Sequence, residues 1–170
     1  MIRSHAASID RLPPLREVIA EYGLNAKRAL GQHFLLDLNL SRRIASSGDN
    51  LNVGTTVEIG PGPGGLTRAL LMEGAERVVA IERDERCVGA LGPLVDAAEG
   101  RLEIIHGDAL EMNVSELGPP PIRIVANLPY NIAPPLLIRW FALGADVSEM
   151  VLMFQLEVAE RITAVTGEKP

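Results

Sequence analysis

The sequence has very little cysteine, few aromatic residues and no long hydrophobic run. Cys87 is the single cysteine, so an internal disulfide and a cysteine-built metal site are both excluded, and we assign its thiol no chemistry. The longest apolar runs, such as VVAI and MVLMF, are far shorter than the about 20 residues that cross a bilayer. The N-terminus also lacks the charged and then apolar pattern of a secretory signal. We therefore expect a cytoplasmic protein with no membrane partner and no bound metal.

The composition is that of one soluble globular domain. Of the 170 residues, 47% are hydrophobic and 22% are charged, which is enough apolar chain to form a substantial core. The net charge of −6 is unevenly distributed, because residues 1–50 contain seven Lys and Arg against five Asp and Glu, whereas residues 51–170 contain nine against seventeen. An acidic surface repels phosphate. A nucleic-acid ligand would therefore need basic surface from the N-terminal arm or from a part outside this chain.

The hydrophobic pattern changes character near residue 56. Before it, PPLREVIAEYG and LNLSRRIASSG predict helices over 13–23 and 38–48. After it, five short apolar runs alternate with helical stretches that begin near Leu66, Asp84 and Pro134; the runs are TVEIG, VVAIE, LEIIH, IRIVA and MVLMF. This alternation predicts an α/β fold, with a parallel sheet covered by helices on both faces and ligand-binding loops at the carboxyl ends of the strands.

The segment VEIGPGPGGLTRAL predicts a glycine-rich turn between the first strand and its helix. Two overlapping patterns fit it: G-x-G-x-x-G, typical of dinucleotide sites, through Gly60, Gly62 and Gly65, and E-x-G-x-G-x-G, typical of S-adenosylmethionine sites, through Glu58, Gly60, Gly62 and Gly64. Pro61 and Pro63 lack the backbone N–H groups that would hold a pyrophosphate, which favours the second pattern. A tight turn without any ligand is the remaining alternative.

Two acidic residues follow the next two strands at the same predicted edge. Glu82 ends VVAIE, where a carboxylate would accept hydrogen bonds from both ribose hydroxyls. Asp108, in IIHGDAL, would accept a hydrogen bond from the exocyclic amine of adenine. Each could instead be a solvated acid at the end of a strand, but their common register with the glycine loop favours a cofactor site.

The segment NLPY follows the fourth strand and predicts a holder for an amino group on a flat ring. The Asn127 amide and the Leu128 carbonyl can both accept from an exocyclic NH₂ group and direct its nitrogen toward an electrophilic methyl group. Pro129 stiffens the turn, and Tyr130 offers a flat face to a base extruded from its stack. A neutral amine needs no strong base, and we identify no His-Asp or Cys-His pair as catalytic.

These motifs together resemble one enzyme family over about Leu12 to Thr163. LGQHFLLD, VEIGPGPGGLT, IERD, GDAL, NLPYNI and FQLEVAERI occur in the order and spacing of the small-subunit ribosomal RNA adenine dimethyltransferases, the KsgA family. The resemblance implies a Rossmann-like class I S-adenosylmethionine-dependent methyltransferase. It also implies S-adenosyl-L-methionine as cofactor, and transfer of two methyl groups to each of two adjacent adenines in the 3′-terminal hairpin of 16S ribosomal RNA during small-subunit biogenesis.

The same resemblance implies roles for particular residues. The family's cofactor contacts fall on His33, Leu35, Gly60, Glu82, Asp108 and Asn127, and its target-base holder falls on Asn127, Leu128, Pro129 and Tyr130. Glu58 and Gly62 join the cofactor set through the glycine pattern. His33 departs from the family, which usually has Asn there, so the detail of that one contact is open.

The resemblance also implies that the chain is a truncated form, because family members continue with two more strands and a helical RNA-contacting domain. We expect residues 1–50 to form a helical arm with a cofactor-capping segment and residues 51–170 to form an incomplete methyltransferase core. Such a fragment should bind cofactor, need no oligomer, and bind and methylate ribosomal RNA of the small subunit poorly. Its fifth strand would be an apolar edge prone to self-association.

Three alternatives differ in function. The nearest is a large-subunit ribosomal RNA adenine methyltransferase of the macrolide-resistance type, which shares the glycine loop and a similar Asn-x-Pro-Tyr turn. An NAD-dependent oxidoreductase is supported only by the overlapping glycine spacing. A ribosome-assembly factor that keeps the fold without the reaction is the third.

Overall fold

The computed structural model describes residues 8–24, 34–128, 132–154 and 156–163, and it contains a five-stranded sheet. The spatial order of the strands is β3-β2-β1-β4-β5, and every neighbouring pair is parallel. The strands are β1 Thr55–Ile59, β2 Arg77–Glu82, β3 Leu102–His106, β4 Ile122–Asn127 and β5 Glu149–Met153. The predicted parallel α/β architecture is confirmed.

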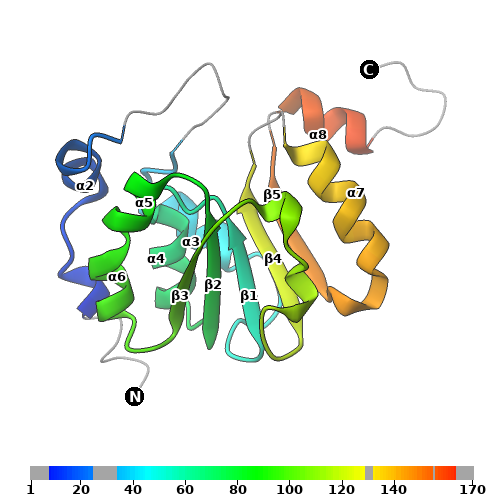
Figure 1. The fold of residues 1–170 in the computed structure, drawn as a ribbon, viewed down its shortest axis with the longest axis horizontal. Coiled ribbons are helices and arrows are strands. Elements are labelled where there is room, and N and C mark those ends of the chain that lie inside the picture. The colour runs from blue at the N-terminus through cyan, green and yellow to red at the C-terminus, as the bar shows by residue number, and fades with distance from the viewer. Residues whose placement is uncertain (1–7, 25–33, 129–131, 155, 164–170) are drawn as a thin grey trace.

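Helices cover both faces of this sheet (Figure 1). One hydrophobic cluster joins one face of the sheet to helices on the N-terminal side of the chain, and a second joins the other face to a single long helix and two short 3₁₀ turns. The first group comprises α3 Leu38–Ala45, α4 Gly65–Met72 and α6 Gly92–Ala97; the second comprises α7 Ala133–Leu143, η2 Ala109–Glu111 and η3 Val114–Glu116. A third, smaller cluster joins α2 Leu15–Glu21 to α5 Glu85–Ala90. A further 3₁₀ turn, η4 Gly144–Asp146, precedes β5, and α8 Leu156–Thr163 follows it.

The central strand β1 is buried along its whole length, as expected for a parallel strand with neighbours on both sides. Its side chains alternate between the two clusters: Val57 and Ile59 pack on the side of α7. Glu58, between them, therefore projects toward the side of α4. The strand order reverses direction at β1, which has β2 on one side and β4 on the other. In open α/β sheets, ligands bind in the crevice at such a switch point.

The helix α3 is attached to α4 by both apolar and polar contacts. Ala45 belongs to the same buried cluster as the α4 side chains. Asp37 caps the start of α3 by accepting hydrogen bonds from the N–H groups of Asn39 and Leu40. Arg42 donates to Glu73, at the end of α4, over 2.6 Å. These contacts position the chain just before α3 beside the glycine loop.

Within the described residues, no helix combines the length and the apolar character needed to cross a bilayer.

Candidate active site

The glycine loop forms a tight turn between β1 and α4. Gly60, Gly62 and Gly64 have φ angles of +68°, +55° and +90°, a region that residues with a Cβ atom rarely adopt. The Gly60 N–H donates to the Ile81 carbonyl over 2.9 Å, which ties the loop to β2. A Cβ atom added at Gly60 would meet no heavy atom of the described residues within 4 Å. The loop is therefore bound to the sheet on one side, and none of the described residues covers Gly60.

The chain before α3 lies directly against this loop. A Cβ atom at Gly62 would come within 3.0 Å of the Phe34 ring. A Cβ atom at Gly65 would collide with the Leu35 carbonyl oxygen. Leu35 thus lies beside the start of α4, close to the loop that the sequence assigned to the cofactor. His33, the other predicted contact in this segment, lies outside the described residues.

Glu82, at the end of β2, accepts hydrogen bonds from three backbone N–H groups. Its Oε2 accepts the Gly62 N–H over 3.0 Å, and its Oε1 accepts the N–H groups of Arg83 and Asp84, each over 2.8 Å. The side chain is 7% exposed. The carboxylate therefore holds the glycine loop to the end of β2, a role that the glycine spacing did not reveal. Oε2, which accepts a single N–H group, retains lone-pair capacity for a further donor.

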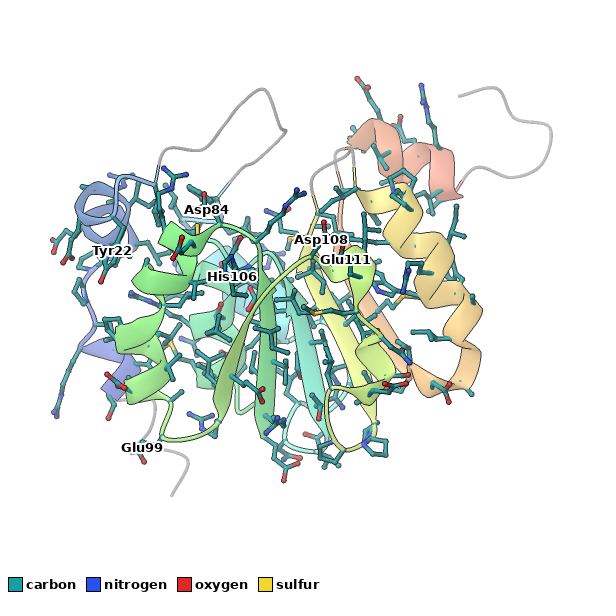
Figure 2. All side chains as sticks on the ribbon, in the orientation of Figure 1. Tyr22, Asp84, Glu99, His106, Asp108 and Glu111 are labelled. Atoms are coloured by element: carbon teal, nitrogen blue, oxygen red, sulfur yellow. The ribbon has the colours of Figure 1, made fainter. Side chains whose placement is uncertain are left out.

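Asp108 lies at the carboxyl end of the strands, after β3 (Figure 2). Its Oδ1 accepts the Leu110 N–H over 2.9 Å and so caps the turn η2. Its Oδ2 lies 3.4 Å from Nη1 of Arg83, a contact that sequence reasoning missed, since only the position of Arg83 beside Glu82 hints at it. The Arg83 side chain is 82% exposed, so this ion pair is weak and can open to another donor.

Glu58 is a buried acid directly beneath the glycine loop. Its side chain is 1% exposed, and its Oε2 atom finds no hydrogen-bond partner among the described residues. Burial, helped by the negative charge of Glu82, raises the pKa of Glu58 from 4.5 to about 8, although the nearby Thr67 hydroxyl opposes part of this rise. A carboxyl group in this position is mostly neutral at physiological pH.

Asn127 ends β4 next to the glycine loop. The register of the sheet pairs Ile59, the last residue of β1, with Ala126 of β4, so Gly60 and Asn127 are the residues that come next on these two neighbouring segments. Leu128 follows with its side chain buried in the α7-side cluster, and its N–H donates to the Met153 carbonyl over 3.4 Å. The structure thus brings together Gly60, Glu82, Asp108 and Asn127 at one edge of the sheet. Pro129 and Tyr130 lie outside the described residues.

Comparison with known proteins identifies the family of this chain. Residues 23–170 match the model of the family described as "Ribosomal RNA adenine dimethylase". The chain belongs to that family. The "Ribosomal RNA small subunit methyltransferase A" of Rhodospirillum rubrum is 58% identical over 160 residues, which are 94% of this chain and 56% of the relative. The chain spans about 56–60% of the length of the first curated relatives it matches.

Two solved structures extend the comparison to the fold. A dimethyladenosine transferase from Plasmodium falciparum matches with a TM-score of 0.68 and 30% identity over 80% of this chain and 48% of that chain. The 23S rRNA methyltransferase ErmE matches with a TM-score of 0.62 and 30% identity over 77% of this chain and 51% of that chain. The predicted family and its Rossmann-like methyltransferase fold are both confirmed.

Proposed function

We propose that this chain is the cofactor-binding and catalytic part of an enzyme that transfers methyl groups from S-adenosyl-L-methionine to the exocyclic amine of adenine in small-subunit ribosomal RNA. The observation that carries the proposal is the register of β1 and β4, which pairs Ile59 with Ala126 and so puts Asn127 next to the point where Gly60 follows β1. A cofactor over the glycine loop and a substrate held at the end of β4 would then be neighbours. The small-subunit names of the 58% identical relatives support this substrate class over the large-subunit alternative.

The site fits the cofactor on three counts. None of the described residues covers Gly60, where close backbone approach is needed. Glu82 and Asp108 present carboxylate oxygens that are acceptors only, which suits ribose hydroxyls and the adenine amine. Pro61 and Pro63 remove two N–H groups that a pyrophosphate would require, which disfavours a dinucleotide. When bound, the cofactor supplies an electrophilic sulfonium methyl group.

The chain's own contribution to the reaction is positioning. The Asn127 amide oxygen would accept a hydrogen bond from the target amine and orient its nitrogen. The buried Leu128 side chain anchors the chain at the end of β4. Pro129 and Tyr130 are proposed to complete the holder, with the tyrosine ring stacking on an extruded base. The amine reacts as a neutral nucleophile, so no strong general base is assigned.

The finer proposal concerns the RNA. We assign the substrate to two adjacent adenines in the 3′-terminal hairpin of 16S ribosomal RNA, each dimethylated, within small subunits in the cytoplasm. The chain by itself is proposed to methylate these subunits slowly, because its acidic balance provides little attraction for phosphate. Methylation by this chain at the rate of a relative of full length would contradict the slow-activity proposal. Macrolide resistance conferred by a full-length relative would instead favour the large-subunit substrate.

Cofactor binding is the first test. In a calorimetric titration we expect S-adenosyl-L-methionine to bind and NAD to give no heat of binding. Asp108→Ala should weaken binding about tenfold or more, since a hydrogen bond to a charged group contributes roughly 1.5–3 kcal/mol. Asp96→Ala, an exposed position on α6, is the matched control and should leave binding unchanged. Binding of NAD alone would overturn the methyltransferase assignment.

A further inference from the structure

Two glutamates flank the glycine loop in opposite environments. Glu82 accepts three backbone N–H groups, an arrangement that suits a carboxylate, because an ionised carboxylate is an acceptor only. Glu58 projects from β1 beneath the same loop, with its Oε2 atom buried and without a hydrogen-bond partner among the described residues. An isolated buried charge is costly, so such a group is protonated instead. Paired acids whose environments differ in this way take different protonation states.

No basic side chain of the described residues is among the groups that shift the pKa of Glu58, so none of them stabilises its ionised form. On β2 the nearest charged group is Glu82, which is negative and raises the Glu58 pKa. On α4 the charged neighbour is Arg68, whose Nη1 donates to the Pro13 carbonyl over 2.7 Å. The residues paired with Glu58 in the sheet are apolar, Ala80 on β2 and Val125 on β4. The Thr67 hydroxyl on α4 is polar but uncharged, and it opposes only part of the rise in the Glu58 pKa.

We propose that Glu58 is protonated in the cofactor-free protein and releases its proton to solvent when the methionine part of S-adenosylmethionine binds over the glycine loop. The cause is charge: the ligand brings a sulfonium and an ammonium group close to an acid whose charge no basic side chain of the described residues stabilises. Only the O–H bond of the carboxyl group breaks: its electron pair stays on the carboxylate, and one proton leaves to solvent for each ligand bound. The inference rests on the proposed cofactor and extends it, because it makes Glu58 a positioning residue whose ionisation is coupled to binding.

The coupling has a definite sign. Burial raises the Glu58 pKa to about 8 in the free protein, and a nearby cation lowers it in the complex. Affinity should therefore rise with pH between the lower pKa of the complex and about 8, and then level off. The α-amino group of the ligand itself titrates near about 7.8, so the measurement belongs below that pH.

The test is isothermal titration calorimetry of S-adenosylmethionine at about pH 7 in buffers that differ in ionisation enthalpy, which counts the protons exchanged. We expect close to one proton to be released per ligand, and release to disappear in Glu58→Gln. Glu157→Gln, an exposed position on α8, should behave as the unsubstituted chain. S-adenosylhomocysteine, which lacks the sulfonium charge, should release fewer protons, and adenosine, which lacks the methionine part, should release none.

The outcomes separate the two proposals. Binding of S-adenosylmethionine without proton release would overturn the role of Glu58 and leave the proposed function standing. Absence of binding would overturn the proposed function, and the coupling with it. Equal release by adenosine would also contradict the assignment to the methionine part. Should Glu58→Gln fail to fold, infrared difference spectra of the unsubstituted chain provide the same test, since the carbonyl band of a protonated carboxylic acid should disappear on binding and its persistence would overturn the proposal.

Discussion

Glu58 also links the stability of the fold to pH. Its pKa is about 8 in the folded chain and 4.5 ordinarily, so the folded state binds more protons than the unfolded state between these values. The free energy of unfolding should therefore fall as pH rises from about 5 to about 8 and level off above that. At roughly 1.4 kcal/mol per pKa unit, the ionisation of Glu58 should lower the free energy of unfolding by an amount of the order of a few kcal/mol across this range.

Urea unfolding across this pH window checks the effect. Glu58→Gln should remove most of the decline and make the substituted chain the more stable of the two near about pH 8, because the amide has no charge to bury. Glu157→Gln should leave the decline intact. An unfolding free energy that rises through the window, or a decline unchanged in Glu58→Gln, would contradict the assignment.

The contact between Gly65 and Leu35 gives a second prediction for single residues. Gly65→Ala places a methyl group against the Leu35 carbonyl oxygen, and backbone cannot move aside as a side chain can. We expect the substitution to lower the free energy of unfolding by about 1–3 kcal/mol. Gly92→Ala is the matched control, because a Cβ atom at this position in α6 meets nothing within 4 Å. Thermal unfolding measures the stability of both variants, and equal stability of the two would show that residue 35 does not pack on the loop.

The sequence predicted which residues lie at the site, but it did not predict the contacts that each of them makes there. Strand ends and glycine spacing located Gly60, Glu82 and Asp108 because the carboxyl ends of parallel strands meet at one edge. The hydrogen bond from Gly62 to Glu82 could not be predicted, since it depends on how the loop turns. The protonation state of Glu58 depends on its burial and its neighbours, which spacing does not encode.

Two adjacent residues of helix α7 are expected to contribute very differently to the free energy of unfolding. Trp140 is 2% exposed within the cluster that covers one face of the sheet, whereas Phe141 is 63% exposed. Trp140→Ala should lower the free energy of unfolding by about 3–5 kcal/mol, as for other large buried side chains. Phe141→Ala should change it by less than about 0.5 kcal/mol. Urea denaturation measures both, and similar losses would mean that α7 packs in a different rotation.

Hydrophobic periodicity predicted the regular elements well. The five apolar runs all became strands, and helices begin at Gly65, Glu85 and Ala133, within one residue of the expected starts. The 3₁₀ turns η2 and η3, by contrast, were not predicted. Three residues are too few to show a period, and these turns are defined by capping side chains, such as Asp108 and Asn113, rather than by an apolar face.

For the whole molecule, the position of β5 carries a prediction about association. It is at one edge of the sheet that the described residues form, and its residues are only half-buried. We expect the chain to self-associate through this edge as its concentration rises, which sedimentation velocity would detect. A double substitution of the exposed α7 residues, Ile138→Ser with Phe141→Ser, should leave association unchanged. A monomer at every concentration, or association lost in the double variant, would contradict the strand edge as the contact.

The strand order has a consequence for how the chain acquires its structure during synthesis. Strand β1 pairs with β2, which follows it closely, but its other partner, β4, comes much later in the chain. As a nascent polypeptide leaves the ribosome, the backbone hydrogen-bonding groups on one side of β1 stay unpaired until residues 122–127 have emerged. Closing such a long loop slows folding and raises contact order. The pairing that brings Gly60 and Asn127 together is thus also expected to be among the last to form.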